Sequence, residues 1–472
     1  MERVWRLIGI VLMLALFAPT ASAQQPARSY LLLGKNDKLP ANLEQAVAEK
    51  GGAVAYTVPE IGLAVLTSAN PDFPAQMESV AQVESVAPDI RVNFYLPGFQ
   101  PSAPPTVNPP LPDDDFFYMF QWNLDAINAP EAWAQGALGA GVRIAIVDDG
   151  LFAQHPDIAP NLNTALSKSF VPGDPAAFTP INFPSHSSHV AGVAAAADNG
   201  IGIIGVAPQA EIVGVRVLTW LPDANSPIGY APEGKFAWLA AGIVYAANIE
   251  SDIINISLGG WLDKNGSCDA DGCISKKDAG ELKKLLDRAT RYAHKKGAVV
   301  IAAAGNDATD TDNNGKNYFL PAESDKVLAV SATGPVGWIF NPTATDLDSF
   351  APYSNYGKKL VDFAAPGGNP TFLYQNPACI IPFAGFPIPC GYFDLVIGPT
   401  ATPFLWTWAS GSSAAVPHVS GVAALVIGKN GGQMNPEQVE QALRKGADDL
   451  SAKGKDAFYG DGRVDAAASL GQ

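Results

Sequence analysis

Short apolar runs alternate with amphipathic stretches along the chain from residue 132 to the C-terminus. The apolar runs have the length of buried strands, and the stretches between them repeat apolar positions at helical spacing. We predict strands at 142–147, 211–218, 252–258, 298–303, 327–331 and 360–364, and helices at 186–197, 236–249, 281–296, 413–429 and 437–445. This alternation is typical of an α/β fold, a three-layer α/β/α sandwich whose mainly parallel sheet is covered by helices on both faces.

Residues 29–95 carry a different pattern, in which strands outnumber helices. The predicted order is strand, helix, strand, strand, helix, strand, with strands at 29–33, 53–58, 63–67 and 83–94 and helices at 42–50 and 72–82. This order predicts a small ferredoxin-like α+β domain that precedes the larger α/β domain.

The first 23 residues have the features of a secretory signal peptide. Arg3 and Arg6 precede an apolar run at 7–17, and Ala21-Ser22-Ala23 provides a small-residue cleavage site. The alternative is an uncleaved membrane anchor, which the short apolar run and the Ala-x-Ala end disfavour. We therefore expect a secreted or periplasmic protein with no membrane contact once the signal is removed.

The remaining chain divides into three predicted parts. A small domain at 24–95 is followed by a linker at 96–115, which contains seven prolines and ends in an acidic run. The large domain then occupies 116–472. This layout is typical of a proprotein, and the alternative is a permanent accessory domain on a stiff hinge.

Charge and cysteine content narrow the function classes. The chain has 30 Lys+Arg and 46 Asp+Glu residues, giving a net charge of −16, which argues against nucleic-acid partners and anionic membrane surfaces. The spacing of the four cysteines favours two local disulfides in an oxidising compartment, Cys268–Cys273 and Cys379–Cys390. A zinc site is the alternative, but no Cys-x-x-Cys supports it.

Three polar residues fall where parallel α/β sheets place their active sites. Asp148 ends a predicted buried strand, while His186 and Ser413 open predicted helices. A serine hydroxyl needs a base to become a nucleophile, and a histidine held by a carboxylate is such a base. Asn306 follows another strand, and its amide together with the Ser413 backbone N–H would stabilise an oxyanion. Together, these four residues predict an enzyme that catalyses acyl transfer.

These residues, in the order Asp, His, Ser, resemble those of subtilisin-like serine proteases, the subtilases. The similar motifs are VDDG at 147–150, HSSHVAG at 186–192, AGN at 304–306 and GSSAAVPHV at 411–419. The resemblance implies a subtilisin-like fold, a secreted endopeptidase and an inhibitory propeptide that the enzyme cuts off itself. It further implies that one strand segment binds substrate backbone: Ser257, Leu258, Gly259 and Gly260.

The resemblance also implies calcium and shows departures from the family pattern. Two segments look like halves of the family's structural calcium site, with ligands supplied by Asp157, Asn199, Ala197, Ile201 and Ile203. Ser187 and Ser188 follow the catalytic histidine, where the family usually has Gly-Thr. Residues 367–407 form a long insertion that contains Cys379 and Cys390; it either shapes the cleft or is a surface loop.

Two other functions compete with a peptidase. An esterase or lipase would use the same triad, but Ser413 lacks the Gly-x-Ser-x-Gly motif of those enzymes. A pseudoprotease acting as a binding module is disfavoured because all four candidate residues are present. We expect a monomer whose partners are protein or peptide substrates and its own propeptide.

Overall fold

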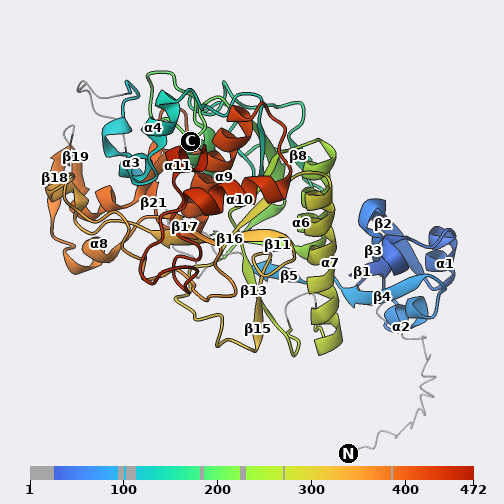
Figure 1. Cartoon of the computed structure of the whole chain (residues 1–472). Coiled ribbons are helices and arrows are strands. Elements are labelled where there is room, and N and C mark those ends of the chain that lie inside the picture. Colours follow the sequence, from blue (N-terminus) through green and yellow to red (C-terminus); the bar gives the residue numbers. More distant parts are fainter. Residues whose placement is uncertain are drawn as a thin grey trace, which may run out of the picture.

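The computed structural model describes residues 26–93, 100–102, 113–180, 185–223, 230–268, 272–383 and 386–471. Within them, a seven-stranded parallel sheet runs in the order β17-β16-β14-β12-β7-β9-β8 (Figure 1). The predicted signal peptide and most of the predicted linker lie outside the described residues. The strand bounds are β7 Arg143–Asp148, β8 Lys168–Ser169, β9 Glu211–Arg216, β12 Ile253–Ile256, β14 Val299–Ala303, β16 Val327–Thr333 and β17 Phe363–Pro366.

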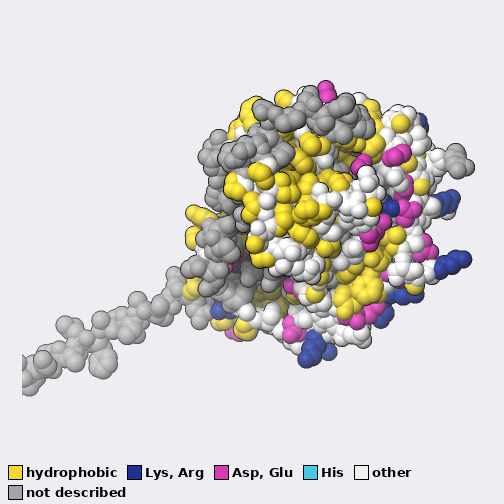
Figure 2. Space-filling model, turned by 90° about the vertical axis from the view of Figure 1, so that its left-hand side faces the viewer, with side chains coloured by type: hydrophobic (Ala, Val, Ile, Leu, Met, Phe, Trp, Pro, Cys, Tyr) yellow, Lys and Arg dark blue, Asp and Glu magenta, His cyan; other side chains and the backbone are white. Residues whose placement is uncertain are grey.

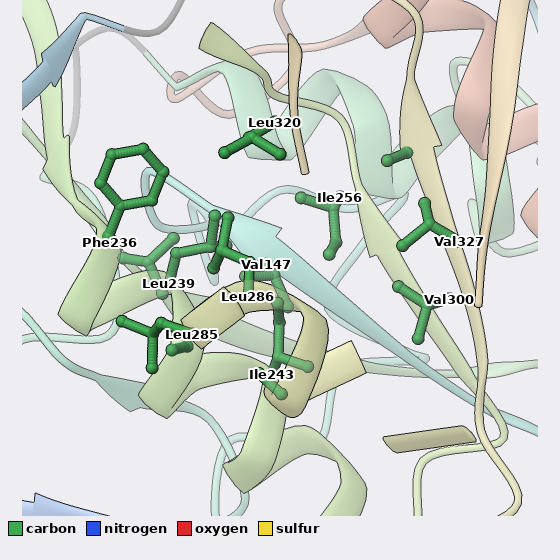
Figure 3. Packing of buried hydrophobic residues seen from close by; sticks show 14 of the residues in the cluster. Val147, Phe236, Leu239, Ile243, Ile256, Leu285, Leu286, Val300, Leu320 and Val327 are labelled. Atoms are coloured by element: carbon green, nitrogen blue, oxygen red, sulfur yellow. The ribbon is translucent and has the colours of Figure 1, made fainter. Parts of the chain in front are cut away.

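Both faces of this sheet are apolar, and helices cover each of them. In β7, Ala145 and Val147 join one core cluster, whereas Ile144 and Ile146 join the cluster on the opposite face. The first cluster packs against α6 Phe236–Asn248 and α7 Lys276–Lys295, as Figure 3 shows around Val147. The second packs against α5 His186–Ala195, α9 Ser412–Lys429 and α10 Pro436–Gly446. The predicted three-layer α/β/α sandwich is therefore confirmed.

The N-terminal unit is a four-stranded antiparallel sheet in the order β2-β3-β1-β4. Alternate residues of β1 face opposite sides: Tyr30 and Leu32 pack with the unit's own helices, while Leu31 and Leu33 join the core that contains α7. The unit therefore docks beside α7 through one sheet face (Figure 1). Its elements are β1 Arg28–Gly34, α1 Leu43–Glu49, β2 Gly52–Val58, β3 Leu63–Ser68, α2 Phe73–Glu78 and β4 Val83–Pro88.

The predicted single strand at 83–94 is wrong. The chain leaves the four-stranded sheet after Pro88, and β5 Arg91–Asn93 pairs instead with β11 Tyr230–Lys235 of the large domain. Asp89 makes the turn, because Ser29 Oγ donates to its carboxylate at 3.1 Å and Lys235 Nζ donates to its carbonyl at 2.9 Å. β11 pairs on its other edge with β10 Leu218–Pro222.

The insertion at 367–407 is built into the molecule rather than lying loosely on it. It contains α8 Thr371–Gln375, β18 Ile380–Phe383, β19 Phe386–Pro389 and β20 Val396–Pro399, and leads into β21 Trp406–Ala409. Trp406 and Trp408 are buried in an aromatic cluster with Phe117 and Phe393. The opposite side of the insertion exposes Tyr374 and Ile380, and Figure 2 shows hydrophobic side chains gathered on this face.

The structure forms both disulfides expected from the spacing, Cys268–Cys273 and Cys379–Cys390. No helix within the described ranges is long and apolar enough to cross a membrane. The remaining short elements are α3 Trp122–Ala126, α4 Ala129–Ala134, α11 Ala466–Ser469, β6 Gln100–Ser102, and 3-10 turns at Lys35–Asp37, Pro59–Ile61, Tyr118–Phe120, Trp338–Phe340 and Cys390–Asp394.

Candidate active site

The three predicted catalytic residues lie at one edge of the central sheet. Asp148 is the last residue of β7, His186 is the first residue of α5, and Ser413 is the second residue of α9. α5 and α9 pack against each other, and both begin at the edge where the parallel strands end. All three side chains are buried. His186 Nδ1 lies 2.8 Å from Asp148 Oδ2, whereas Ser413 Oγ has no hydrogen-bond partner among the described residues.

Asp148 and His186 form a buried, coupled pair. Burial alone would lower the pKa of His186, but the charge of Asp148 and the hydrogen bond between them outweigh it and raise that pKa above 6.5. Burial also raises the pKa of Asp148, and the attraction of His186 partly offsets this effect. A bond from Asp148 to Nδ1 leaves Nε2 of the neutral ring as the proton acceptor.

Asp149 holds the start of α5 through contacts that the sequence analysis missed. Its Oδ2 accepts hydrogen bonds from the His186 backbone N–H and from Trp220 Nε1, each at 3.0 Å. Its Oδ1 accepts from Ser187 N–H at 2.9 Å and Ser187 Oγ at 2.7 Å. These bonds tie the start of α5 to the end of β7. They also account for Ser187, which replaces the family's glycine and gives Asp149 an extra donor. The two adjacent aspartates at 148 and 149 were the feature of the sequence that could have indicated these contacts.

The other four histidines all have a lowered pKa. Burial lowers the pKa of His155 and His189 to about 4 and that of His418 to about 3. Each of these three rings lies within hydrogen-bond distance of a backbone carbonyl. The pKa of His294 is also lowered, chiefly by burial. His186 is thus the one histidine of the five whose pKa is raised.

Asn306 is oriented by Ser412, the residue before Ser413. Asn306 Oδ1 accepts from the Ser412 backbone N–H at 2.8 Å and from Ser412 Oγ at 2.9 Å. Ser412 Oγ in turn accepts from the Gly305 backbone N–H at 3.0 Å. Because these bonds hold the amide oxygen of Asn306 towards Ser412, the amide nitrogen of Asn306 points away from Ser412. The Ser413 N–H lies in the first turn of α9, where amides have no acceptor within the helix.

The predicted substrate-binding residues 257–260 follow β12 and lead into β13 Gly260–Asp263. Ser257 is buried, and Asn255 Nδ2 donates to its hydroxyl at 2.9 Å. β13 pairs with β15 Asn317–Leu320, which brings the Phe319 ring under Gly259. A Cβ at Gly259 would lie 2.5 Å from that ring, so the close approach requires glycine.

The chain's own N-terminal segment lies beside this strand. β5 pairs with β11, with Val92 opposite Gly234, and also contacts β13. Arg91 anchors it through an ion pair with Glu233 at 3.0 Å. Strand β5 therefore pairs with β11 and contacts β13, the strand that begins at Gly260.

The predicted calcium ligands gather around the loop at 197–203. Asp157 is buried, and its Oδ2 accepts from Trp406 Nε1 at 2.6 Å and from Ile203 N–H at 3.2 Å. Asn199 Oδ1 accepts from Ile201 N–H at 2.9 Å, and Ala197 N–H donates to the Asp157 carbonyl. Asp157 Oδ1 is buried without a partner among the described residues, and burial raises the pKa of this carboxyl to about 7.

Asp115 joins this loop from the end of the predicted linker. Its Oδ1 accepts from Ile201 N–H at 2.9 Å, while its Oδ2 is buried and lacks a partner in the described part of the chain. Burial, reinforced by Asp113, raises the pKa of Asp115 to about 8. Carboxylate oxygens of Asp113, Asp114, Asp115 and Asp198 lie within 4.8 Å of one another. Oxygen-rich donors of this kind suit calcium.

Comparisons with known proteins agree with this geometry. The model of the subtilase family matches residues 139–462. Thermitase from Thermoactinomyces vulgaris is 33% identical over 356 residues, which cover 75% of this chain and 97% of thermitase. Subtilisin Savinase from Lederbergia lenta is 30% identical over 350 residues, covering 74% and 97% of the two chains.

Solved structures show the same fold. The epidermin leader peptide processing serine protease from Staphylococcus aureus superposes with a TM-score of 0.71 over 94% of this chain and 98% of its own, at 23% identity. Fervidolysin from Fervidobacterium pennivorans superposes with a TM-score of 0.66 at 21% identity, over 96% of this chain and 62% of its own. At these identities the likeness concerns the fold alone. The family match and the identity to thermitase go further, and they show that the chain belongs to the subtilase family of serine peptidases.

Proposed function

We propose that this chain is a secreted endopeptidase in which Ser413, His186 and Asp148 act as a catalytic triad. The observation that carries the proposal is the buried hydrogen bond between Asp148 and His186, the one histidine of the five whose pKa is raised. His186 takes the proton of Ser413 Oγ as this oxygen attacks the substrate carbonyl carbon. Asp148 holds the ring tautomer and stabilises the imidazolium. His186 then gives the proton to the leaving amine.

The negative oxygen of the tetrahedral intermediate lies between two preset donors. These are the amide nitrogen of Asn306, which Ser412 orients, and the backbone N–H of Ser413 at the start of α9. Because neither donor has to reorient during the reaction, they stabilise the transition state more than the ground state. Acyl-enzyme hydrolysis repeats the sequence, with water as the nucleophile.

The chain is made as a proenzyme, with residues 1–23 as the signal peptide and 24–95 as the inhibitory propeptide. The pairing of β5 with β11 and its contact with β13 support this role, since they lay the chain's own segment against the strand that begins at Gly260, the last of the proposed substrate-binding residues. Cleavage falls within residues 94–115 and releases the peptidase domain. Most of this window lies outside the described residues.

Calcium binds at the loop 197–203 in this proposal. Asp157 and Asp115 supply carboxylate oxygens, and the two buried oxygens that lack partners among the described residues support a cation between them. Asn199 and the carbonyl groups of Ala197, Ile201 and Ile203 complete the donor set. The ion compensates buried negative charge that otherwise destabilises the fold.

The test is the intact mass and N-terminal sequence of the secreted chain, compared with those of its Ser413→Ala variant. Loss of the N-terminal unit in the wild type and its retention in the variant would establish self-cleavage by Ser413. Identical processing of both would assign the cut to another protease. Retention in both would refute the proenzyme.

Parallel assays separate the rival functions. The proposal expects casein hydrolysis well above hydrolysis of a short-chain ester, and an esterase would give the reverse. A pseudoprotease would give neither activity. Ser413→Ala controls for contaminating enzymes in both assays.

A further inference from the structure

The ring of Phe319 lies between two glycines that come from different parts of the site. A Cβ at Gly259 would lie 2.7 Å from the Cζ of this ring, and a Cβ at Gly305 would lie 2.6 Å from the same atom. Gly259 belongs to the proposed substrate-binding residues, and Gly305 precedes Asn306, a proposed oxyanion donor. The tip of a phenyl ring therefore occupies the space that two residues without side chains leave between these segments.

A bound substrate needs this same space. In the proposed mechanism, the carbonyl oxygen of the bond to be cut lies between the amide nitrogen of Asn306 and the Ser413 N–H. The substrate backbone before that bond lies along residues 257–260. The substrate residue that contributes the carbonyl group is therefore held by both segments at once, and the gap between Gly259 and Gly305 is the room that its side chain has.

The Phe319 ring is held in this gap by its neighbours. Phe319 is 2% exposed, and the Trp261 ring of β13 meets it edge-on, with the ring centroids 4.8 Å apart. Trp261 Nε1 donates to Asp307 Oδ2 at 2.9 Å, which ties the two rings to the turn that carries Asn306. The Phe319 backbone N–H donates to Glu323 Oε1 at 2.7 Å, and the Glu323 N–H donates to the Phe319 carbonyl at 2.9 Å. Backbone and ring are thus both fixed.

We propose that Phe319 restricts the substrate residue before the cut bond to small side chains. The enzyme then cleaves after Gly, Ala or Ser and discriminates against Leu, Phe and Tyr at this position. The inference rests on the proposed endopeptidase function and names its substrate class. Phe319 is thus a specificity-determining residue that acts by occupying the room a larger substrate side chain would need.

The packing around the ring explains why size decides. Glycine has no side chain and alanine adds one methyl group, so a substrate with either residue leaves the Phe319 ring in place. A leucine or phenylalanine side chain would have to push the ring against Trp261 and against the backbones of Gly259 and Gly305. Closely packed interiors do not absorb such added volume without strain, which weakens binding of the larger substrate.

The experiment measures kcat/KM of the full chain, used in the form in which it is secreted, on succinyl-Ala-Ala-Pro-Xaa-p-nitroanilide with Ala, Leu or Phe as Xaa. Mass spectrometry of a casein digest gives the cut sites in a protein substrate. Phe319→Ala empties the gap. Tyr318→Ala is the matched control, because it removes the ring of the adjacent residue of β15, which points to the opposite side, where Lys264 Nζ lies 4.3 Å from the ring centroid.

For the wild type, we expect kcat/KM for the Ala peptide to exceed that for the Leu and Phe peptides about 100-fold, and casein to be cut after Gly, Ala and Ser. In Phe319→Ala, the ratio of the Phe to the Ala peptide rises about 100-fold, whereas Tyr318→Ala keeps the wild-type ratio. Each ratio is measured within one preparation, so a partly unfolded variant still reports it. If Phe319→Ala does not fold, Phe319→Val shortens the side chain and is expected to raise the ratio of the Leu to the Ala peptide about tenfold.

Three results overturn the inference. The first is wild-type cleavage of the Leu or Phe peptide as fast as the Ala peptide. The second is cutting of casein mainly after large side chains, which decides the matter even if no peptide is hydrolysed. The third is an unchanged ratio in the folded Phe319 variant. Hydrolysis of neither casein nor any peptide refutes the proposed function instead.

Discussion

At the scale of a single residue, Ser412 connects two parts of the proposed oxyanion site. Its hydroxyl donates to Asn306 Oδ1 at 2.9 Å and accepts from the Gly305 backbone N–H at 3.0 Å. The hydroxyl thus adds to the bond from the Ser412 backbone N–H and links the Asn306 amide to the end of the preceding strand. A free Asn306 amide would sample orientations that do not stabilise the oxyanion.

Ser412→Ala is expected to lower kcat about tenfold and to leave KM almost unchanged. Asn306→Ala removes the donor itself and is expected to cost about 10²–10³ in kcat. Ser412→Thr keeps the hydroxyl and serves as the matched control, with activity near the wild-type value. Steady-state kinetics on a peptide substrate measure these effects. An increase in KM alone for Ser412→Ala would contradict a positioning role.

The pH profile tests the Asp148–His186 pair. Only neutral His186 accepts the Ser413 proton, so kcat/KM rises with pH as His186 loses its proton. Since the charge of Asp148 raises the pKa of His186, the midpoint is expected above 6.5. His294→Gln is the control, because His294 lies on α7 away from the site and its loss should leave the midpoint unchanged. A midpoint at or below 6.5 would refute the pairing.

At the scale of elements, two buried carboxylates meet at the loop 197–203: Asp115 from the segment before the large domain, and Asp157 from within that domain. Asp115 and Asp157 each carry an oxygen without a partner among the described residues. Uncompensated buried charge destabilises the folded state, whereas a bound calcium ion turns the same oxygens into ligands.

Calcium is expected to raise the melting temperature of the Ser413→Ala chain by several degrees relative to chelator. Asp115→Asn removes most of this calcium-dependent gain, and without calcium it melts no lower than its parent, because the unfavourable burial of one carboxyl group is gone. Glu44→Gln, at an exposed acid of α1, is the control and retains the full gain. Differential scanning calorimetry gives these values. An undiminished calcium effect in Asp115→Asn would place the ion elsewhere.

The sequence predicted most of these elements because parallel strands and amphipathic helices leave strong local patterns. It proposed Asp148, His186, Ser413 and Asn306 because each ends or follows a predicted strand or opens a predicted helix, and the structure places them at those positions. It missed contacts between distant segments, such as Asp149 with Trp220 and Asp115 with the loop at 197–203. It also missed the break at Pro88, because the partner of β5 is β11, about 140 residues away in sequence.

At the scale of the whole molecule, α7 holds the N-terminal unit through a cluster of charges. Arg288 is buried at the centre: its Nη1 donates to the carbonyls of Gly34 and Ile61 at 3.0 and 3.1 Å. Its Nη2 donates to Glu84 at 2.5 Å, and its Nε lies 3.0 Å from Asp37. Four groups of the unit therefore depend on one guanidinium.

Arg288→Met is expected to weaken docking of the N-terminal unit by about 2 kcal/mol. This lies below the cost for a fully buried pair, because Glu84 and Asp37 are partly exposed. Hydrogen exchange of the full Ser413→Ala chain measures it, since amides of α7 and of the turn Pro59–Ile61 lose protection when the unit detaches. Arg291→Met is the matched control on the same helix, because Arg291 pairs with Asp325 of the large domain. If both variants exchange alike, while β7 and α9 stay protected, Arg288 does not hold the unit. If only Arg288→Met exchanges faster, the same substitution in a chain that keeps Ser413 should release active peptidase earlier after self-cleavage.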